Sequence, residues 1–312
     1  MKNRLNQNFC ILLIIFCIFP LCGIAKKNLT ASDRSQDNLL GKVKNIQTIE
    51  YSVAVRNKEL QKGEVVTRSV KSYNLSGWIT ENIEFDADNM VLQKEVSMFD
   101  KKENKIEEWL YNENNELEQR TKMKYNAQNL PVQIIVEDDK GKKIQQSTYI
   151  YDEQGYLTQL IGYDDRGKMS EKSYYTYDQR GNLTKYIGYG QFDNRKIYYK
   201  YDANNKITEQ LCTDIKDNFT EKIIFQYENQ GKLEKRISID LNNNVLSTII
   251  YKYDDYNNLL EFTHTDKDGA IIERHEFTYQ YDKNNNWIKQ TFYSGTEKTP
   301  LSITERIIEY YE

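Results

Sequence analysis

Hydrophobic and polar residues alternate along most of the chain from Lys42 onward. Between Ile271 and Tyr281, the odd positions read Ile, Glu, His, Phe, Tyr and Tyr, whereas the even positions read Ile, Arg, Glu, Thr and Gln. A period of two is typical of a β-strand with one apolar face and one polar face. The first such strands are predicted at KVKNIQTIEYSVAV and VVTRSVKSY, with a loop around Lys62 and Gly63.

The alternation is organised by an internal repeat of about 26 residues. Each copy is anchored by an aromatic residue that precedes the turn. The anchors are Tyr73, Phe99, Tyr125, Tyr151, Tyr177, Tyr201, Tyr227, Tyr253 and Tyr281. A weaker series lies between them, so that successive steps run mostly 12, 14, 12 and 14 residues. A fixed period of this length indicates a repeat architecture.

Each copy carries the signature of a tight turn. In YDEQGYL, Asp152 can accept a hydrogen bond from the backbone two residues on, and Gly155 occupies the left-handed position that closes a hairpin. Glycine, asparagine and aspartate tolerate this position best. The assigned turn residues are Asp152, Gly155, Asp178, Gly181, Asp202, Asn205, Gly231, Asn257 and Asn285, and Asp217 fills the same position in its copy. Two copies deviate: FDKKENKI after Phe99 is read as one residue longer, and GQFDNRKI after Tyr189 as out of register.

The spacings between turns decide which side each strand shows. Because 12, 14 and 26 are all even, every strand presents its aromatic residues on the same side. The sequence therefore predicts an antiparallel β-meander of about 18–20 strands, built from 26-residue hairpin repeats, with one set of turns along each edge. A flat sheet of that size would be about 90 Å wide. Since sheets twist, we expect a curved or spirally coiled sheet with its aromatic face inward, and the pattern leaves open whether it closes.

Tyrosine is the main apolar residue of this pattern. The chain has 25 tyrosines but only 38% hydrophobic residues, so tyrosine must supply much of the buried surface. Paired tyrosines precede the turns and should form ladders across the sheet. Where such rings are exposed they suit stacking on sugars or anchoring of interfaces. The possible binding face comprises Tyr149, Tyr151, Tyr175, Tyr177, Tyr199, Tyr201, Tyr251, Tyr253, Tyr279 and Tyr281.

The unit Tyr-Asp-x-x-Gly-x-Leu-Thr, present as YDEQGYLT at Tyr151 and YDQRGNLT at Tyr177, resembles the YD repeat of the Rhs family. That family includes bacterial polymorphic toxins and the teneurin cell-surface proteins. The resemblance covers roughly residues 73 to 293 and implies β-hairpins that wind into a shell, which in large members encloses a toxic domain. The chain has no Asp-Pro pair, so the family's self-cleavage motif is absent, and it ends directly after the last repeat. It is similar to stand-alone exported YD-repeat proteins of bacteria.

The first residues have the pattern of an export signal. Lys2 and Arg4 precede an apolar stretch from Phe9 to Leu21, and a small-residue ending leads to predicted cleavage after Ala25. A competing reading makes Cys22 a lipid-modified N-terminus. We therefore predict a signal peptide at 1–25, a polar tether at 26–38 and the repeat domain at 39–312, with export to the periplasm, the cell surface or the medium. No transmembrane span is expected after signal cleavage.

The charge and the rare residues restrict the chemistry. Loss of Lys2 and Arg4 with the signal changes the formal charge from −4 to −6, which gives no basis for nucleic-acid binding. Cys212 is then the sole cysteine, so no internal disulfide is possible. The two histidines, His264 and His275, have no partners at zinc-binding or catalytic spacing. We predict no cofactor, no metal and no catalytic residue.

Calcium binding and glycoside hydrolysis are two further chemistries that the acidic residues could suggest. Acidic pairs such as Asp164-Asp165 sit at turns, where the first aspartate already has a turn-forming role, so calcium binding is disfavoured. Glu171, Glu221 and Glu273 occupy equivalent positions, as a cross-strand charge ladder would, and no carboxylate pair stands out as hydrolytic.

Three functional hypotheses remain. The first is a non-enzymatic exported repeat protein that binds a glycan or a protein at the cell surface. The alternative is an accessory or remnant of an Rhs-type toxin shell. A secreted hydrolase is the third.

Overall fold

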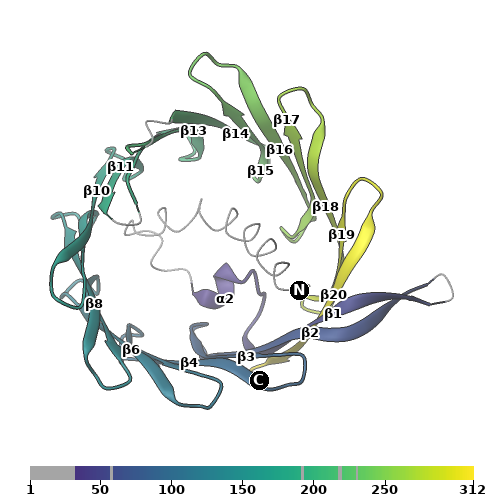
Figure 1. Ribbon diagram of the computed structural model, residues 1–312, viewed down its shortest axis with the longest axis horizontal. Coiled ribbons are helices and arrows are strands. Elements are labelled where there is room, and N and C mark those ends of the chain that lie inside the picture. The colour runs from purple at the N-terminus through teal and green to yellow at the C-terminus, as the bar shows by residue number, and fades with distance from the viewer. Residues whose placement is uncertain (1–31, 57–58, 191–192, 217–219, 230) are drawn as a thin grey trace.

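The described residues form a single antiparallel sheet of twenty strands closed into a ring, with one short helix inside it (Figure 1). The computed structural model describes residues 32–312, apart from 57–58, 191–192, 217–219 and 230. The predicted export signal and Asp217 therefore lie outside the described residues. The predicted all-β meander is confirmed, and the observed strand number falls at the upper end of the expected range.

The strands follow one another without a crossover. Their bounds are β1 Val43–Arg56, β2 Glu59–Tyr73, β3 Ile79–Phe85, β4 Val91–Phe99, β5 Lys105–Tyr111, β6 Leu117–Tyr125, β7 Pro131–Asp138, β8 Lys143–Tyr151, β9 Leu157–Tyr163, β10 Met169–Tyr177, β11 Leu183–Gly190, β12 Arg195–Tyr201, β13 Ile207–Asp214, β14 Thr220–Tyr227, β15 Leu233–Ile239, β16 Val245–Tyr253, β17 Leu259–Asp266, β18 Ile271–Tyr281, β19 Trp287–Ser294 and β20 Thr299–Tyr310. Each strand pairs with its sequence neighbours. The turns after the YD tyrosines consequently share one edge of the ring, called the YD rim below, and the other turns share the opposite edge.

Closure is made by the first and last strands. β20 pairs with β19 on one side and with β1 on the other, in a register that runs from Val43 opposite Tyr310 to Ser52 opposite Ser302. On the outer side of this seam, Lys44 forms an ion pair of 2.6 Å with Glu309, and Lys62 forms one of 2.8 Å with Glu305. No repeat motif lies in the β1 sequence, so the repeat could not predict this pairing.

Fifteen of the hairpin turns in the described part of the chain share one geometry. Each of these has a hydrogen bond from the N–H of its first residue to the carbonyl four residues on, as between Asp178 and Asn182 at 2.9 Å. The residue in the fifth position of the motif has positive φ, as in Gly155 at 86° and Asn285 at 64°. A register shift follows in the strand pair, which is the bulge expected of a type I turn closed by a left-handed residue.

One deviation predicted from the sequence is wrong. The turn after Phe99 has the ordinary length, because the N–H of Asp100 bonds to the carbonyl of Asn104 at 2.9 Å, and Glu103 takes the left-handed position with φ 65°. The turn pattern in the sequence was defined by glycine, asparagine or aspartate at this position, so the glutamate made the turn look one residue longer.

The predicted loop at Lys62 and Gly63 is also wrong, because both residues lie within β2. Gly63 is instead required by close packing: a Cβ on it would collide with the hydroxyl of Ser52, which accepts a hydrogen bond from Glu64 N at 2.9 Å. The irregular register of the β1–β2 pair falls at this point. Glycine here permits a close approach of two strands rather than a turn.

Part of the predicted tether is folded. Residues Asp33–Gln36 form the short helix α2, which Ser32 caps and which lies inside the ring (Figure 1). Asp37 then bonds to Lys71 at 2.9 Å and accepts a hydrogen bond from the Tyr73 hydroxyl at 2.6 Å. Because α2 and Asp37 lie inside, these contacts identify the inner face of β2.

Strand pairing carries this assignment around the ring. Along β10 to β13, Tyr175 lies opposite Tyr186, Tyr186 opposite Ile197 and Ile197 opposite Cys212, all on the inner wall. The largest cluster of buried apolar side chains forms there, from Leu157, Tyr175, Leu183, Tyr186 and Ile197. A second cluster, of Leu39, Val43, Ile46 and Tyr73, lies beside the seam.

Candidate functional site on the inner wall

The structure places the ten predicted binding-face tyrosines on the inner wall of the ring. Tyr175 is buried, and the other nine are half-buried. None of them is among the large apolar side chains that are mainly exposed. These rings therefore form a belt close to the YD rim, called the aromatic belt below.

Several hydroxyls of the aromatic belt are held by the backbone. Tyr151 donates to the carbonyl of Pro131 at 2.7 Å, and Tyr201 donates to that of Leu183 at 2.7 Å. The same bond joins Tyr125 to Lys105, Tyr227 to Ile207 and Tyr279 to Leu259. Each acceptor is the first residue of the preceding strand, beside the bulge that ends the regular ladder. A tyrosine at or two residues before the anchor thus satisfies a backbone carbonyl at the rim while its ring is half-buried.

The rings also contact one another. Tyr251 stacks with Tyr253 at 6.5 Å between centroids, Tyr175 meets Tyr186 at 5.4 Å, and Phe277 stacks on Phe292 at 5.1 Å. Pairs of this kind stabilise a sheet by about 0.2–1 kcal/mol each. The main role of the tyrosines is thus structural, as their regular positions predicted.

Burial shifts the ionisation of these phenols. It raises the pKa of Tyr125, Tyr253 and Tyr279 to about 12, from an ordinary value of 10.0. Burial also raises the pKa of Tyr151 and Tyr175. The neutral phenol is the form that the folded ring accommodates.

We expect the ring to unfold cooperatively in alkali. A folded pKa above the unfolded value stabilises the fold fully below pH 10, and this contribution is lost as the pH rises through about 12. Ultraviolet absorbance of phenolate and far-ultraviolet circular dichroism, followed together, should show the belt tyrosines ionising only as strand structure disappears. Full phenolate absorbance near pH 10 with strand structure intact would contradict the inner-wall placement.

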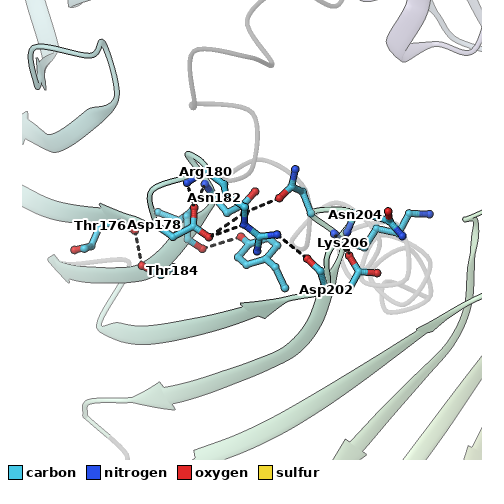
Figure 2. Close-up of polar contacts among 11 residues, drawn as sticks. Thr176, Asp178, Arg180, Asn182, Thr184, Asp202, Asn204 and Lys206 are labelled. Carbon is cyan, nitrogen blue, oxygen red and sulfur yellow. Dashed lines mark hydrogen bonds and ion pairs between the residues drawn. The ribbon is translucent and has the colours of Figure 1, made fainter.

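The YD rim is reinforced by contacts between successive turns, as Figure 2 shows for two of them. Arg180 donates to the carbonyl of Asp202 at 3.0 Å, and Asn182 donates to the side-chain oxygen of Asn205 at 2.9 Å. Lys206 and Lys232 continue the series to Gly231 and Asp254. Asn182 also bonds Asp178 within its own turn, at 3.0 Å. The assigned turn residues are brought together as a polar chain along one rim.

A polar belt lies on the inner wall six residues before seven of the anchors, about 13–20 Å along the strand from the aromatic belt. Its members are Gln93, Gln119, Gln145, Glu171, Arg195, Glu221 and Ser247. Glu171 packs against Gly162 and Gly190 of the two neighbouring strands, where any side chain would collide with it. Glu221 accepts a hydrogen bond from Ser238 at 2.5 Å. The inner wall is therefore aromatic toward one rim and hydrogen-bonding toward the other.

The irregular repeat after Tyr189 builds a partly buried network that sequence reasoning missed. Asp193 accepts a hydrogen bond from the Tyr186 hydroxyl at 2.5 Å and pairs with Arg195 at 2.8 Å, while Ser173 meets Tyr186 at 3.2 Å. Hydrogen bonding with Asp193 raises the pKa of Arg195. Every side chain in this network is satisfied by its neighbours, which makes it a packing device. Its only signal in the sequence was the broken repeat register.

His275 and Cys212, which belong to residue types that are rare in this chain, lie on the inner wall as well. His275 stands between Phe262 and Phe292 and pairs with Glu273 at 3.1 Å. Cys212 is half-buried, and burial raises the pKa of its thiol, which keeps it protonated and unreactive. Within the described part of the chain, no three potential ligand side chains come together as a metal site.

One comparison with known proteins, against family models, agrees with this architecture. The family model for the teneurin YD-shell matches residues 21–269. The chain belongs to the teneurin YD-shell family. A comparison with curated proteins finds no matching sequence. No helix among the described residues is both long and apolar enough to cross a membrane.

The solved structures that the comparison matches have low identity to this chain and TM-scores below 0.5. The crystal structure of TcdB2-TccC3-Cdc42 is 12% identical with a TM-score of 0.45, and the match covers 85% of this chain and 16% of that one. A porin-like protein from Bacteroides uniformis is 11% identical with a TM-score of 0.37, over 86% of this chain and 98% of the other. The Photorhabdus luminescens Tc holotoxin pore is 11% identical with a TM-score of 0.19, over 76% and 19%. The chain thus spans less than a fifth of the toxin proteins it matches.

Proposed function

We propose that this protein is a non-catalytic shell module whose closed ring encloses a segment of polypeptide. The observation that carries the proposal is that the ring already holds a stretch of chain inside it. Leu40 donates from its N–H to the side chain of Asn286 at 2.7 Å and accepts from the same side chain at 2.8 Å. Asn38 reaches the carbonyl of Tyr256 at 3.1 Å. The side chain of Asn286 thus binds both backbone groups of Leu40, and the side chain of Asn38 binds a backbone carbonyl of the YD rim.

The dimensions and chemistry of the inner wall support a larger guest. Twenty strands at about 4.8 Å spacing make a ring roughly 30–40 Å across, and rings of more than sixteen strands are not filled by their own side chains. The carboxamides of Gln93, Gln119 and Gln145 in the polar belt can both donate and accept, which suits an unfolded backbone. The aromatic belt offers apolar contact at the other rim. Membership of a family named for its shell agrees with this role.

Adjacent residues on β12 test the proposal directly. Tyr199 faces the inner wall, whereas Tyr198 faces outward, so a photo-crosslinking benzoylphenylalanine at each position samples one side only. Irradiation of producing cells should join the position 199 variant to one polypeptide, which stays protease-resistant in the intact complex. The position 198 variant is the matched control. Failure of position 199 to capture any polypeptide, or equal capture from both positions, would overturn the proposal.

We also propose export of the protein through residues 1–25. This rests on the basic and apolar pattern of those residues, which lie outside the described structure. Mass spectrometry of the mature protein should find Lys26 at its N-terminus. A lipid-modified Cys22 would instead establish an anchored form, and an uncleaved Met1 would refute export by this route.

A further inference from the structure

Arg306 on β20 lies on the inner wall of the ring, beside the seam. It is opposite Thr48 of β1, and two residues further along both strands Ile46 is opposite Ile308. These two isoleucines pack in the buried cluster beside the seam, which lies on the inner side of the ring. Residues two apart on a strand share a face. The side chain of Arg306 therefore belongs to the inner wall.

The guanidinium of Arg306 has no protein partner for its N–H groups. Among the described residues it has no hydrogen-bond acceptor and no carboxylate within ion-pair distance, and its Nε is buried. Asp37 is close enough to act on it electrostatically, but the carboxylate of Asp37 is held by Lys71 at 2.9 Å and by the Tyr73 hydroxyl at 2.6 Å. A buried charged donor without an acceptor is costly, so its presence requires an explanation.

The indole of Trp287 holds this guanidinium in a defined orientation. The central carbon of the guanidinium lies over the ring, 3.3 Å from its centroid. Trp287 is half-buried and contacts Tyr279, with their ring centroids 6.0 Å apart. Because the N–H groups of arginine lie in the plane of the guanidinium, stacking on its face leaves its edge available to a ligand. Two parallel N–H donors on such an edge match the two oxygens of a carboxylate.

The charges around Arg306 favour a ligand with a single negative charge. Burial lowers the pKa of Arg306 to about 10, from an ordinary value of 12.5, so the surroundings disfavour an uncompensated cation. Lys71 forms an ion pair with Asp37, which leaves one positive charge to be balanced. Glu50 lies on the same inner face, one row further from the YD rim, and accepts a hydrogen bond from Thr67 at 3.4 Å. Its charge would repel a phosphate or a polyanion more strongly than a single carboxylate.

We propose that Arg306 and Trp287 form a carboxylate-binding site on the inner wall, which takes one carboxylate of the enclosed polypeptide. The inference rests on the proposed function for the source of this ligand. The edge of the guanidinium binds both carboxylate oxygens, and the rings of Trp287 and Tyr279 contact apolar groups next to the carboxylate. A polypeptide offers this chemistry at its C-terminus and on each aspartate or glutamate side chain.

Three short peptides test the site in protein that has been denatured and refolded alone, so that it carries no guest. Acetyl-Ala-Phe-Ala has a free terminal carboxylate, its amide has none, and acetyl-Ala-Glu-Phe-Ala amide has a carboxylate on a side chain. In NMR spectra of protein with isotope-labelled arginine, we expect both carboxylate peptides to move the Nε–H resonance of Arg306. The amide and inorganic phosphate should each bind at least about tenfold more weakly. The tighter of the two carboxylate peptides identifies a chain end or an acidic side chain as the natural ligand.

Arg306→Lys and a second arginine provide the controls. The lysine keeps the charge but loses the planar edge, so it should weaken binding of the carboxylate peptides by about tenfold or more, and the arginine resonance missing from its spectrum is that of Arg306. Arg120 already donates from its Nε to Glu107 at 3.2 Å, and its resonance should stay in place. Circular dichroism establishes that the refolded protein and each variant have the native strand content.

Four results would overturn the proposal. These are no response of Arg306 to either carboxylate peptide, equal or tighter binding of the amide or of phosphate, an unaltered affinity in folded Arg306→Lys, and a shifted Arg306 resonance in Asp37→Asn without peptide. The last would show that Asp37 is the partner of the guanidinium. The peptides titrate the site with no guest present, so a negative result here leaves capture at position 199 standing. Absence of capture there, with Arg306 responding to peptide, would refute enclosure and retain the site.

Discussion

Replacing Gly181 by valine should destabilise the ring more than any other single change at a turn. Gly181 has φ 82°, a conformation that costs a β-branched residue about 1–3 kcal/mol. A Cβ there would also collide with the hydroxyl of Tyr156, whose ring stacks on Tyr177 at 5.0 Å. The collision displaces an aromatic contact that links two successive hairpins. We expect a loss of roughly 3 kcal/mol or more in the free energy of unfolding, measured by denaturant titration.

Gly141→Val is the matched control for this change. Gly141 has nearly the same φ, 77°, but nothing lies within 4 Å of an added Cβ. It should therefore lose only the backbone strain of about 1–3 kcal/mol. The difference between the two variants measures the contribution of the Tyr156 contact. Equal losses would show that the turn-to-turn contact contributes nothing to stability.

Introducing a carboxylate at Val43 should open the seam. Val43 is 0% exposed, lies opposite Tyr310 in the β1–β20 pair, and packs in the cluster with Leu39 and Ile46. An unpaired charge at this position costs on the order of 4 kcal/mol. Hydrogen exchange should show β1 and β20 losing protection in Val43→Asp before the strands on the far side of the ring do.

Val66→Asp provides the comparison on the same hairpin. Val66 is 47% exposed on β2, so a carboxylate there stays hydrated and should change the free energy of unfolding by less than about 0.5 kcal/mol. Uniform loss of protection throughout Val43→Asp would mean that closure is inseparable from folding. Unchanged protection at the seam would contradict the role of the cluster.

The regular part of the ring could be predicted because local chemistry determines it. The spacing of about 26 residues keeps the YD anchors on the inner face, and the left-handed position after each aspartate sets the turn. The prediction that anchors 12 or 14 residues apart share this face is wrong. Odd-numbered residues pair with even-numbered ones across each bulged turn, as Tyr175 does with Tyr186, so Tyr189 faces outward. Glu103 and Gly63 show where this logic fails. Glu103 occupies a left-handed turn position and is held there by the backbone hydrogen bonds of the turn. At Gly63 a glycine is needed because the side chain of Ser52 lies too close for a Cβ.

Contacts between residues far apart in the chain could not be predicted from the sequence. Closure depends on pairing between β1 and β20, which lack the repeat motif, and the docking of residues 33–40 depends on Asp37 and Asn286 meeting partners far away in the chain. The candidate site likewise has a part that could be predicted from the sequence and a part that could not. The inner tyrosines followed from parity, and the structure shows them half-buried or buried. The exposed Tyr174 and Tyr198 have the opposite parity to their inward-facing neighbours in the chain. Tyr189 shares the odd parity of the aromatic belt and still faces outward, so parity alone gave the wrong face for it.

The pairing of β1 with β20 has a kinetic consequence. Nineteen of the twenty strand junctions join sequence neighbours, so hairpins can form and add to one another at little entropic cost. The remaining junction closes a loop of some 260 residues, for which the entropic cost is about 5 kcal/mol. Refolding should therefore show a fast phase in which strands assemble and a slower phase in which the two ends meet.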